Sequence, residues 1–264
     1  MIWAVLLAAV YPTLYPGSGT TGLVKVPAPG IRYRMNMATA TRSPWVDSNV
    51  SVYRRDPKAN YFCDVRTKSV QLAAAEAFSQ GVAVSLETTP DQKQDYDAIL
   101  DFLKTIPEGP VKPWADVRIA SDDGSAQAAE ALNLLARRNI FYTRDAFHGL
   151  AIHLDSKIAN PYEFMQDVRE RIGDEKRILR IFGSELTIAT LTRGGKHVRL
   201  QLVNYGSRPV ETLRIRIEGH YTEKNIRARV FKAAEPRLSG FVHEGGYTEF
   251  TLEELPLYAV LDLD

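Results

Sequence analysis

The sequence has a single cysteine, Cys63, among its 264 residues. One cysteine can form no disulfide within the chain and no zinc site built from cysteines, so the fold has to be held by its packed core. Cys63 lies in the aromatic, strand-like stretch NYFCDV. That stretch lacks the glycine-rich turn that exposes a nucleophilic cysteine, so we predict a buried, unreactive thiol.

Net charge is also nearly absent. The chain has 33 Lys and Arg residues against 32 Asp and Glu residues. This balance removes the electrostatic argument for a nucleic-acid partner or an anionic membrane surface. No phosphate-binding or dinucleotide-binding glycine motif follows a predicted strand, and the five histidines lack metal-ligand spacing. We therefore expect no cofactor, no metal and no nucleic-acid partner.

No apolar run has the length of about 20 residues that a membrane-spanning helix needs. The run MIWAVLLAAV is shorter and more typical of a secretory signal, although no Lys or Arg precedes it and no clean cleavage site follows. We expect residues 1–23 to be a signal peptide with a linker, in a secreted or periplasmic bacterial protein. The alternative is a cytosolic protein in which this run forms an apolar first strand.

Hydrophobic residues make up 45% and charged residues 25% of the chain, the composition of a soluble globular protein. Residues 24–155 alternate between strand-like and helix-like segments. SVQLAAAEAFSQG predicts a helix ending at Gly81, VAVSLE a buried strand, and DQKQDYDAILDFLKT an amphipathic helix. Strands that alternate with helices are typical of a parallel sheet. We predict an α/β domain here, either a partial barrel or a flavodoxin-like layer.

Two further segments complete the predicted organisation. Residues 156–176 contain NPYEFMQDVRERI, in which Asn160 is suited to cap a bridging helix. Residues 177–264 consist of short alternating segments separated by glycine turns; in HVRLQLVN, for example, Val198, Leu200 and Leu202 share one face. About six or seven such strands predict a C-terminal all-β sandwich.

The C-terminal stretches VRLQLVNYGSRPVETLRIRIEG and FTLEELPLYAVLDLD resemble the β-sandwich that ends many bacterial glycoside hydrolases built on TIM barrels. ADVRIASDDGSAQAAEALNLLARRNIFYTR resembles part of the amidotransferase-like domain of trimeric-type β-galactosidases. The whole chain is also similar to a group of secreted, uncharacterised bacterial proteins. A (β/α)8 barrel takes about 250 residues. The resemblance therefore implies accessory modules without the catalytic barrel, and possible contacts between identical subunits.

Carboxylates at strand ends are the candidates for catalysis. Glu87 ends the predicted strand VAVSLE, where ligands gather in barrels and open α/β sheets. Glycoside hydrolysis needs a second carboxylate roughly 5 to 10 Å away. We take Asp47 as the hypothetical partner, with Asp64 and Asp122 as alternatives. The structural alternative is that the Glu87 carboxylate only caps the turn or helix that follows the strand.

The segment NMATATRSPWVDSN, residues 36–49, shows no helical period and little strand alternation, so we expect an irregular loop. In it Trp45 can stack on a sugar ring while polar neighbours bind hydroxyls. The predicted ligand-binding residues in and after this segment are Arg42, Trp45, Asn49 and Arg55. The structural alternative buries Trp45 in the core and pairs Arg55 with Asp56 or Asp64.

SDDGSAQ is the third candidate site. Asp122 and Asp123 follow a predicted strand, and Gly124 and Ser125 lead into a helix whose first N–H groups lack partners. Such a turn can bind a sugar hydroxyl, and the alternative is capping by Asp123 or Ser125.

These observations predict a secreted, carbohydrate-associated protein: a glycosidase-like accessory protein or a pair of carbohydrate-binding modules. One alternative is a structural or oligomerisation protein without catalytic activity. Another is a shortened glycoside hydrolase that uses Glu87 and Asp47, so the sequence leaves open whether the chain is an enzyme. The binding and enzyme hypotheses require four side chains to converge on one cleft, and the structural hypothesis does not. These side chains are Trp45, Asp47, Arg55 and Glu87.

Overall fold

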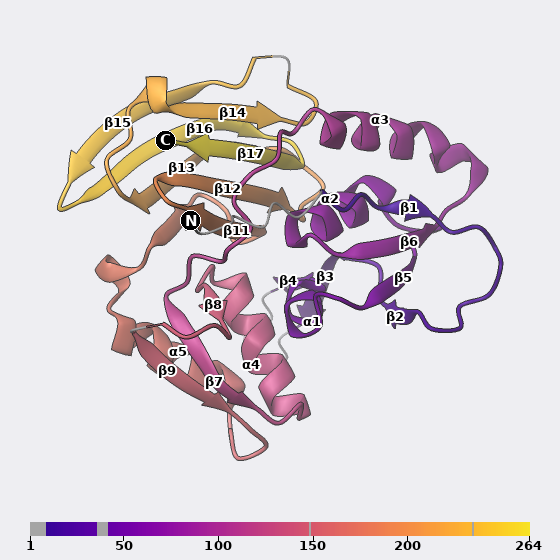
Figure 1. The fold of residues 1–264 in the computed structure, drawn as a ribbon, viewed down its shortest axis with the longest axis horizontal. Coiled ribbons are helices and arrows are strands. Elements are labelled where there is room, and N and C mark those ends of the chain that lie inside the picture. Colours follow the sequence, from indigo (N-terminus) through magenta and orange to yellow (C-terminus); the bar gives the residue numbers. More distant parts are fainter. Residues whose placement is uncertain (1–8, 36–41, 148, 234) are drawn as a thin grey trace, which may run out of the picture.

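The computed structural model describes residues 9–35, 42–147, 149–233 and 235–264. An α/β half occupies the first two thirds of the chain, and a β-sandwich occupies the rest (Figure 1). The predicted combination of a parallel-sheet α/β part with antiparallel sheets is therefore present.

Sheet A is a four-stranded sheet in which all neighbouring strands are parallel. Its strands in spatial order are β1 (Thr13–Leu14), β6 (Ala83–Glu87), β5 (Asn60–Asp64) and β2 (Val24–Val26). Strand β1 comes from the segment expected to be signal peptide and linker. It forms one edge of the sheet.

Helices α1 (Val50–Arg55) and α2 (Val70–Gln80) cover one face of sheet A. Ser69 caps α2 by accepting the N–H of Leu72, and Gly81, at φ +65°, ends it as predicted. The other face of the sheet carries alternate residues, among them Lys25, Phe62 and Ser85. On this second face Phe62 is buried and contacts the Tyr15 ring, whereas Lys25 is exposed.

The segment expected to be an irregular loop, residues 36–49, is described only from residue 42 onward, and there it is part of a β-hairpin. Strands β3 (Gly30–Met35) and β4 (Arg42–Asp47) pair in antiparallel register, with Gly30 opposite Asp47. Backbone hydrogen bonds between the two strands form the hairpin without a regular alternation of apolar and polar residues. The expectation of a loop was wrong because it relied on that alternation.

A second parallel sheet has the order β8 (Tyr142–Thr143), β7 (Val117–Asp122) and β9 (Leu150–Leu154). Helices α4 (Ala126–Arg137) and α5 (Pro161–Ile172) pack on it, and Asn160 caps α5 as predicted. Helix α3 (Lys93–Lys104) packs along α2. The short 3-10 helices are η1 (Pro90–Gln92), η2 (Asp174–Lys176) and η3 (Glu223–Asn225).

The C-terminal part consists of two antiparallel four-stranded sheets that share one apolar core. Val198, Leu200 and Leu202 are buried in this core, as their alternation predicts. The strands of sheet E are β10 (Leu179–Phe182), β13 (Val210–Glu218), β16 (Tyr247–Leu255) and β15 (Leu238–Glu244). Those of sheet C are β11 (Thr187–Gly194), β12 (His197–Asn204), β17 (Tyr258–Leu263) and β14 (Ile226–Val230).

Helix α2 connects the α/β half to the sandwich, because it packs against both β6 and β12 (Figure 1). Its Glu76 is fully buried and accepts hydrogen bonds from the Asn49 N–H (2.8 Å), the Asn49 side-chain amide (3.0 Å) and the Tyr205 hydroxyl (2.7 Å). One turn later, the Ser79 carbonyl accepts from Gln201 of β12 (3.2 Å). The two halves therefore meet through a core that contains satisfied polar groups.

Glu76→Gln tests this buried contact through the pH dependence of stability. Burial raises the pKa of Glu76, and hydrogen bonds from Tyr205 and Asn49 oppose the rise without cancelling it. In the native state Glu76 then keeps its proton to a higher pH than in the unfolded chain, where the pKa of this carboxyl is near 4.5. The stability that this proton contributes is present below that value and is lost as the pH rises through the native pKa.

Glutamine does not titrate, so the stability of the wild type relative to the variant should fall by roughly 1–3 kcal/mol as the pH rises above the unfolded value. Urea unfolding of both proteins at a series of pH values measures this difference. A difference that is constant across the series would contradict the assignment.

Candidate functional site

The carboxyl ends of β5 and β6 bring two carboxylates together. Asp64 and Glu87 are the last residues of these strands and lie directly opposite each other in the parallel register. Neighbouring strands are about 4.8 Å apart. The carboxyl edge of a parallel sheet is also where open α/β folds bind ligands. The two side chains thus form a pair at the edge where the sequence predicted a site.

Arg66 binds both carboxylates. Its guanidinium lies 2.7 Å from Asp64 Oδ2 and 3.3 Å from Glu87 Oε1, and its backbone N–H donates to Asp64 Oδ1 (3.2 Å). The side chains of Arg66, Asp64 and Glu87 are 51%, 36% and 30% exposed. The side-chain and backbone hydrogen bonds from Arg66 lower the pKa of Asp64 to about 2. Asp64 is therefore ionised at neutral pH, and the group remains accessible to a ligand.

We call Asp64, Arg66 and Glu87 the carboxyl-edge triad. It offers carboxylate oxygens that accept hydrogen bonds and guanidinium N–H groups that donate them. Sequence reasoning considered Asp64 and Glu87 but missed Arg66. The available signal was its position two residues after Asp64, where an Asp side chain commonly accepts the backbone N–H.

Asp47 lies in the hairpin and pairs with Arg32 through two hydrogen bonds, Nε to Oδ2 (2.5 Å) and Nη2 to Oδ1 (2.6 Å). The carboxylate in register beside Glu87 is Asp64. The assignment of Glu87 and Asp47 as an acid/base pair stays a prediction, and no contact among the described residues joins the two side chains.

Trp45 is half-buried and packs against the core of the second parallel sheet. The Arg137 guanidinium lies 4.0 Å from its ring centroid, so a cation covers one ring face. Asn49 is buried, and its amide donates to the Pro27 carbonyl (2.9 Å) as well as to Glu76. Arg42 pairs through its backbone with Met35, and its side chain lies outside the described residues.

Arg55 pairs with Asp122, whereas the structural alternative expected Asp56 or Asp64. Its Nε and Nη2 atoms donate to the two oxygens of Asp122 at 2.9 and 2.8 Å, and Arg144 adds a third bond at 2.7 Å. The Asp122 side chain is only 3% exposed. Burial would raise its pKa, but hydrogen bonds from the Gly124 N–H and Arg55 outweigh burial and lower the pKa. This ion pair joins α1 to β7.

Asp123 accepts backbone N–H groups of Ser125 (2.9 Å) and Ser156 (2.8 Å). Ser125 in turn caps α4 by accepting the Ala128 N–H. These are the contacts of the capping alternative for SDDGSAQ. The four side chains whose convergence distinguished the hypotheses, Trp45, Asp47, Arg55 and Glu87, have separate partners. The partners are, in the same order, Arg137, Arg32, Asp122 and Arg66.

Cys63 is fully buried, as predicted, and burial together with the nearby charge of Glu76 raises the pKa of its thiol to about 12. Within the described parts of the chain, no group of three or more His, Cys, Asp and Glu side chains is arranged to hold a metal ion. Nor does any described helix have the length and apolarity to cross a membrane.

Comparison with solved structures identifies the type of fold. An α-L-fucosidase isoenzyme 2 from Paenibacillus thiaminolyticus matches 81% of this chain with a TM-score of 0.57 at 8% identity. The chain shares the fold of the matched part of this fucosidase. It covers 62% of the fucosidase chain, and an identity this low establishes the fold alone.

A family 30 xylanase from Clostridium acetobutylicum also matches 81% of the chain and is covered to 71%, at 10% identity. Its TM-score of 0.22 is too low to support an argument. No protein-family model and no curated protein sequence matches the chain.

Arg66→Ala tests the electrostatics of the carboxyl-edge triad. Removing the guanidinium should raise the pKa of Asp64 from about 2 toward its ordinary 3.8, without reaching it, because the backbone N–H bond remains. NMR titration of the Asp64 carboxyl measures this pKa. Arg144→Ala is the matched control, since Arg144 pairs with Asp122. An unchanged Asp64 titration in Arg66→Ala would show that Arg66 does not hold the carboxylate in solution.

Proposed function

We propose that this protein binds carbohydrate through the carboxyl-edge triad, as a secreted or periplasmic accessory protein related to glycosidases. One observation carries the proposal: Asp64 and Glu87 stand side by side at the carboxyl edge of a parallel sheet, both bound by Arg66 and all three partly exposed. The glycoside-hydrolase-like fold and the resemblance to sandwich modules of β-galactosidases support a sugar as the ligand.

The triad matches the hydrogen-bonding pattern of a sugar. Each hydroxyl of a sugar both donates and accepts, so neighbouring hydroxyls are bound well by carboxylates that alternate with a guanidinium. Charge-assisted hydrogen bonds of this kind are about twice as strong as neutral ones. The triad therefore favours a polyhydroxylated ligand over an anionic one, which two carboxylates would repel.

An aromatic side chain completes the proposed site. Tyr15 directly follows β1, and its N–H donates to the Leu86 carbonyl (2.9 Å) one residue before Glu87. Its ring contacts Phe62 edge-on, with centroids 4.9 Å apart. Tyr15 is half-buried, so part of its ring is available to the apolar face of a sugar.

Binding fits the triad better than hydrolysis does. Glycosidases need one carboxylic acid with a raised pKa that protonates the leaving oxygen. Arg66 lowers the pKa of Asp64, which is the opposite direction. A shortened glycoside hydrolase that uses Glu87 and Asp47 is the weaker candidate, because Asp47 is engaged by Arg32.

Assembly into a homo-oligomer is a second candidate, favoured by the exposed strand β2 of sheet A. Val24 of this strand is 45% exposed, and Lys25 is exposed beside it. Lys25 would pair with Asp64 or Glu87 of a second copy. Under this alternative the triad and its surroundings form an interface instead of a ligand site.

A glycan array followed by calorimetry with the best-bound saccharide tests the proposal. Glu87→Gln removes one charge-assisted hydrogen bond and should weaken binding at least tenfold. Asp101→Asn is the control, because it removes a carboxylate that is 75% exposed on α3. Equal binding by the wild type and Glu87→Gln would contradict the proposed site. The absence of any bound glycan, together with a light-scattering mass of two chains, would favour assembly.

A further inference from the structure

A pocket lies apart from the carboxyl-edge triad, where α3 meets the edge strand β14 of the sandwich. Its volume is about 390 Å³, within the range of small-molecule sites. The pocket is lined by Phe102 of α3 and by residues of β14 and the segment that follows, including Arg229, Val230, Lys232 and Pro236. The lining contains two cations and no carboxylate.

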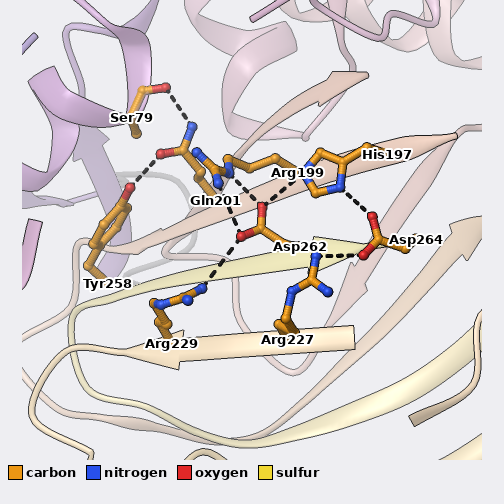
Figure 2. Close-up of polar contacts among 9 residues, drawn as sticks. All are labelled: Ser79, His197, Arg199, Gln201, Arg227, Arg229, Tyr258, Asp262 and Asp264. Carbon is orange, nitrogen blue, oxygen red and sulfur yellow. Dashed lines mark hydrogen bonds and ion pairs between the residues drawn. The ribbon is translucent and has the colours of Figure 1, made fainter. Parts of the chain in front are cut away.

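Arg229 is held near an aspartate that another arginine already satisfies (Figure 2). Asp262 is buried, and it binds Arg199 through two hydrogen bonds, Nε to Oδ1 (2.6 Å) and Nη2 to Oδ2 (3.1 Å). Arg229 Nη1 lies 3.6 Å from Asp262 Oδ2, too far for a hydrogen bond. This nitrogen is buried and has no hydrogen-bond partner among the described residues. Buried donors normally have a hydrogen-bond partner, and Nη1 has only this long ion pair with Asp262. The Arg229 side chain as a whole is 33% exposed and lines the pocket, so its guanidinium can donate to a ligand oxygen there.

The two charged side chains that line the pocket, Arg229 and Lys232, are both positive. Asp262 and Asp264 are the carboxylates of the network in Figure 2, and three arginines, Arg199, Arg227 and Arg229, bind them. His197 contacts both aspartates. Lys232, at the pocket itself, donates to the neutral amide oxygen of Gln71 (3.0 Å) and keeps its charge uncompensated. The pocket should therefore attract an anion.

The remaining wall of the pocket is apolar. The Phe102 ring meets Phe231 and Tyr258 edge-on, with centroids 5.4 and 6.2 Å apart, which fixes its orientation. Lys232 has φ +68°, a left-handed conformation that costs energy for a residue with a side chain. The pocket thus combines a fixed aromatic ring with two cations.

We propose that this pocket binds a sugar acid, a monosaccharide that carries a carboxylate. The Arg229 guanidinium binds the carboxylate, Lys232 adds a second positive charge, and Phe102 packs on the apolar face of the ring. The choice of a sugar over another ringed acid rests on the proposed function. The preference for an anion does not, because it follows from Arg229 and Lys232.

Calorimetric titration with D-glucuronate, D-glucose and benzoate tests the proposal. D-glucuronate should bind, and D-glucose, which has no carboxylate, should bind at least tenfold more weakly. Benzoate has the carboxylate and a ring but no hydroxyls. Benzoate binding as tight as that of D-glucuronate would overturn the assignment of a sugar, and equal binding of D-glucose would overturn the role of the cations.

Arg229→Gln and Arg227→Gln form a matched pair of variants. Both remove one arginine charge from β14. Arg229 pairs with Asp262 of β17 and Arg227 with Asp264, which follows that strand, but only Arg229 lines the pocket. Arg229→Gln should weaken D-glucuronate binding at least tenfold, and Arg227→Gln should change it by less than about twofold. Equal losses in the two variants would reduce the effect to general electrostatics and overturn the site.

Two further measurements keep the test decisive. Lys232→Gln should also weaken D-glucuronate binding. Because the Lys232 side chain is exposed, this variant should fold, and it takes the place of Arg229→Gln in the test if that variant fails to fold. Glu87→Gln should leave D-glucuronate binding unchanged, which separates this pocket from the carboxyl-edge triad. Loss of D-glucuronate binding in Glu87→Gln would place the ligand at the triad and overturn the pocket.

Discussion

The burial of helix α2 on two sides is the constraint on which the rest of the structure depends. Its alanines allow close approach to sheet A, and its Glu76 is bound by Asn49 from one side and by Tyr205 of the sandwich from the other. An unpaired carboxylate in this position would cost several kcal/mol. The hydrogen bonds to Glu76 therefore require the α/β half and the sandwich to dock in one arrangement.

Both proposed sites follow from the position of α2. Arg66 lies in the four-residue connection between Asp64, at the end of β5, and the Ser69 cap of α2, so the helix sets where the guanidinium can reach. Helix α3 packs along α2 and carries Phe102 to the edge of sheet C. A shift of α2 would thus change the carboxyl-edge triad and the sugar-acid pocket together.

Much of the secondary structure could be predicted because it depends on local patterns. Helix α2 has a helix-forming composition and ends at Gly81, and α5 begins at the Asn160 cap. The sandwich strands show an alternation of apolar and polar residues. The β3–β4 hairpin has no such pattern, and its pairing arises between strands. The segment before Val24 was predicted to be a signal peptide with a linker because its first residues are apolar. Within it, Thr13–Leu14 pairs with β6, a contact that only the tertiary fold reveals.

The functional side chains were harder to predict for a similar reason. The strand end at Glu87 follows from the order of elements along the chain, whereas that order left Asp47, Asp64 and Asp122 all open as its carboxylate neighbour. The partners of Trp45 and Asn49, namely Arg137 and Glu76, come from distant helices that only the tertiary fold brings near. Among the described residues Arg229 Nη1 has no hydrogen bond, which likewise depends on how Arg199 occupies Asp262 and which no local pattern reveals.

The central claim is that sugar binds at the carboxyl edge of sheet A, and mapping of amide chemical shifts during titration with a bound saccharide tests it most directly. The account predicts that the largest shifts fall on the backbone amides of Tyr15, Arg66 and Glu87 and their immediate neighbours. Shifts confined to the sandwich, with these three amides unmoved at saturation, would contradict it.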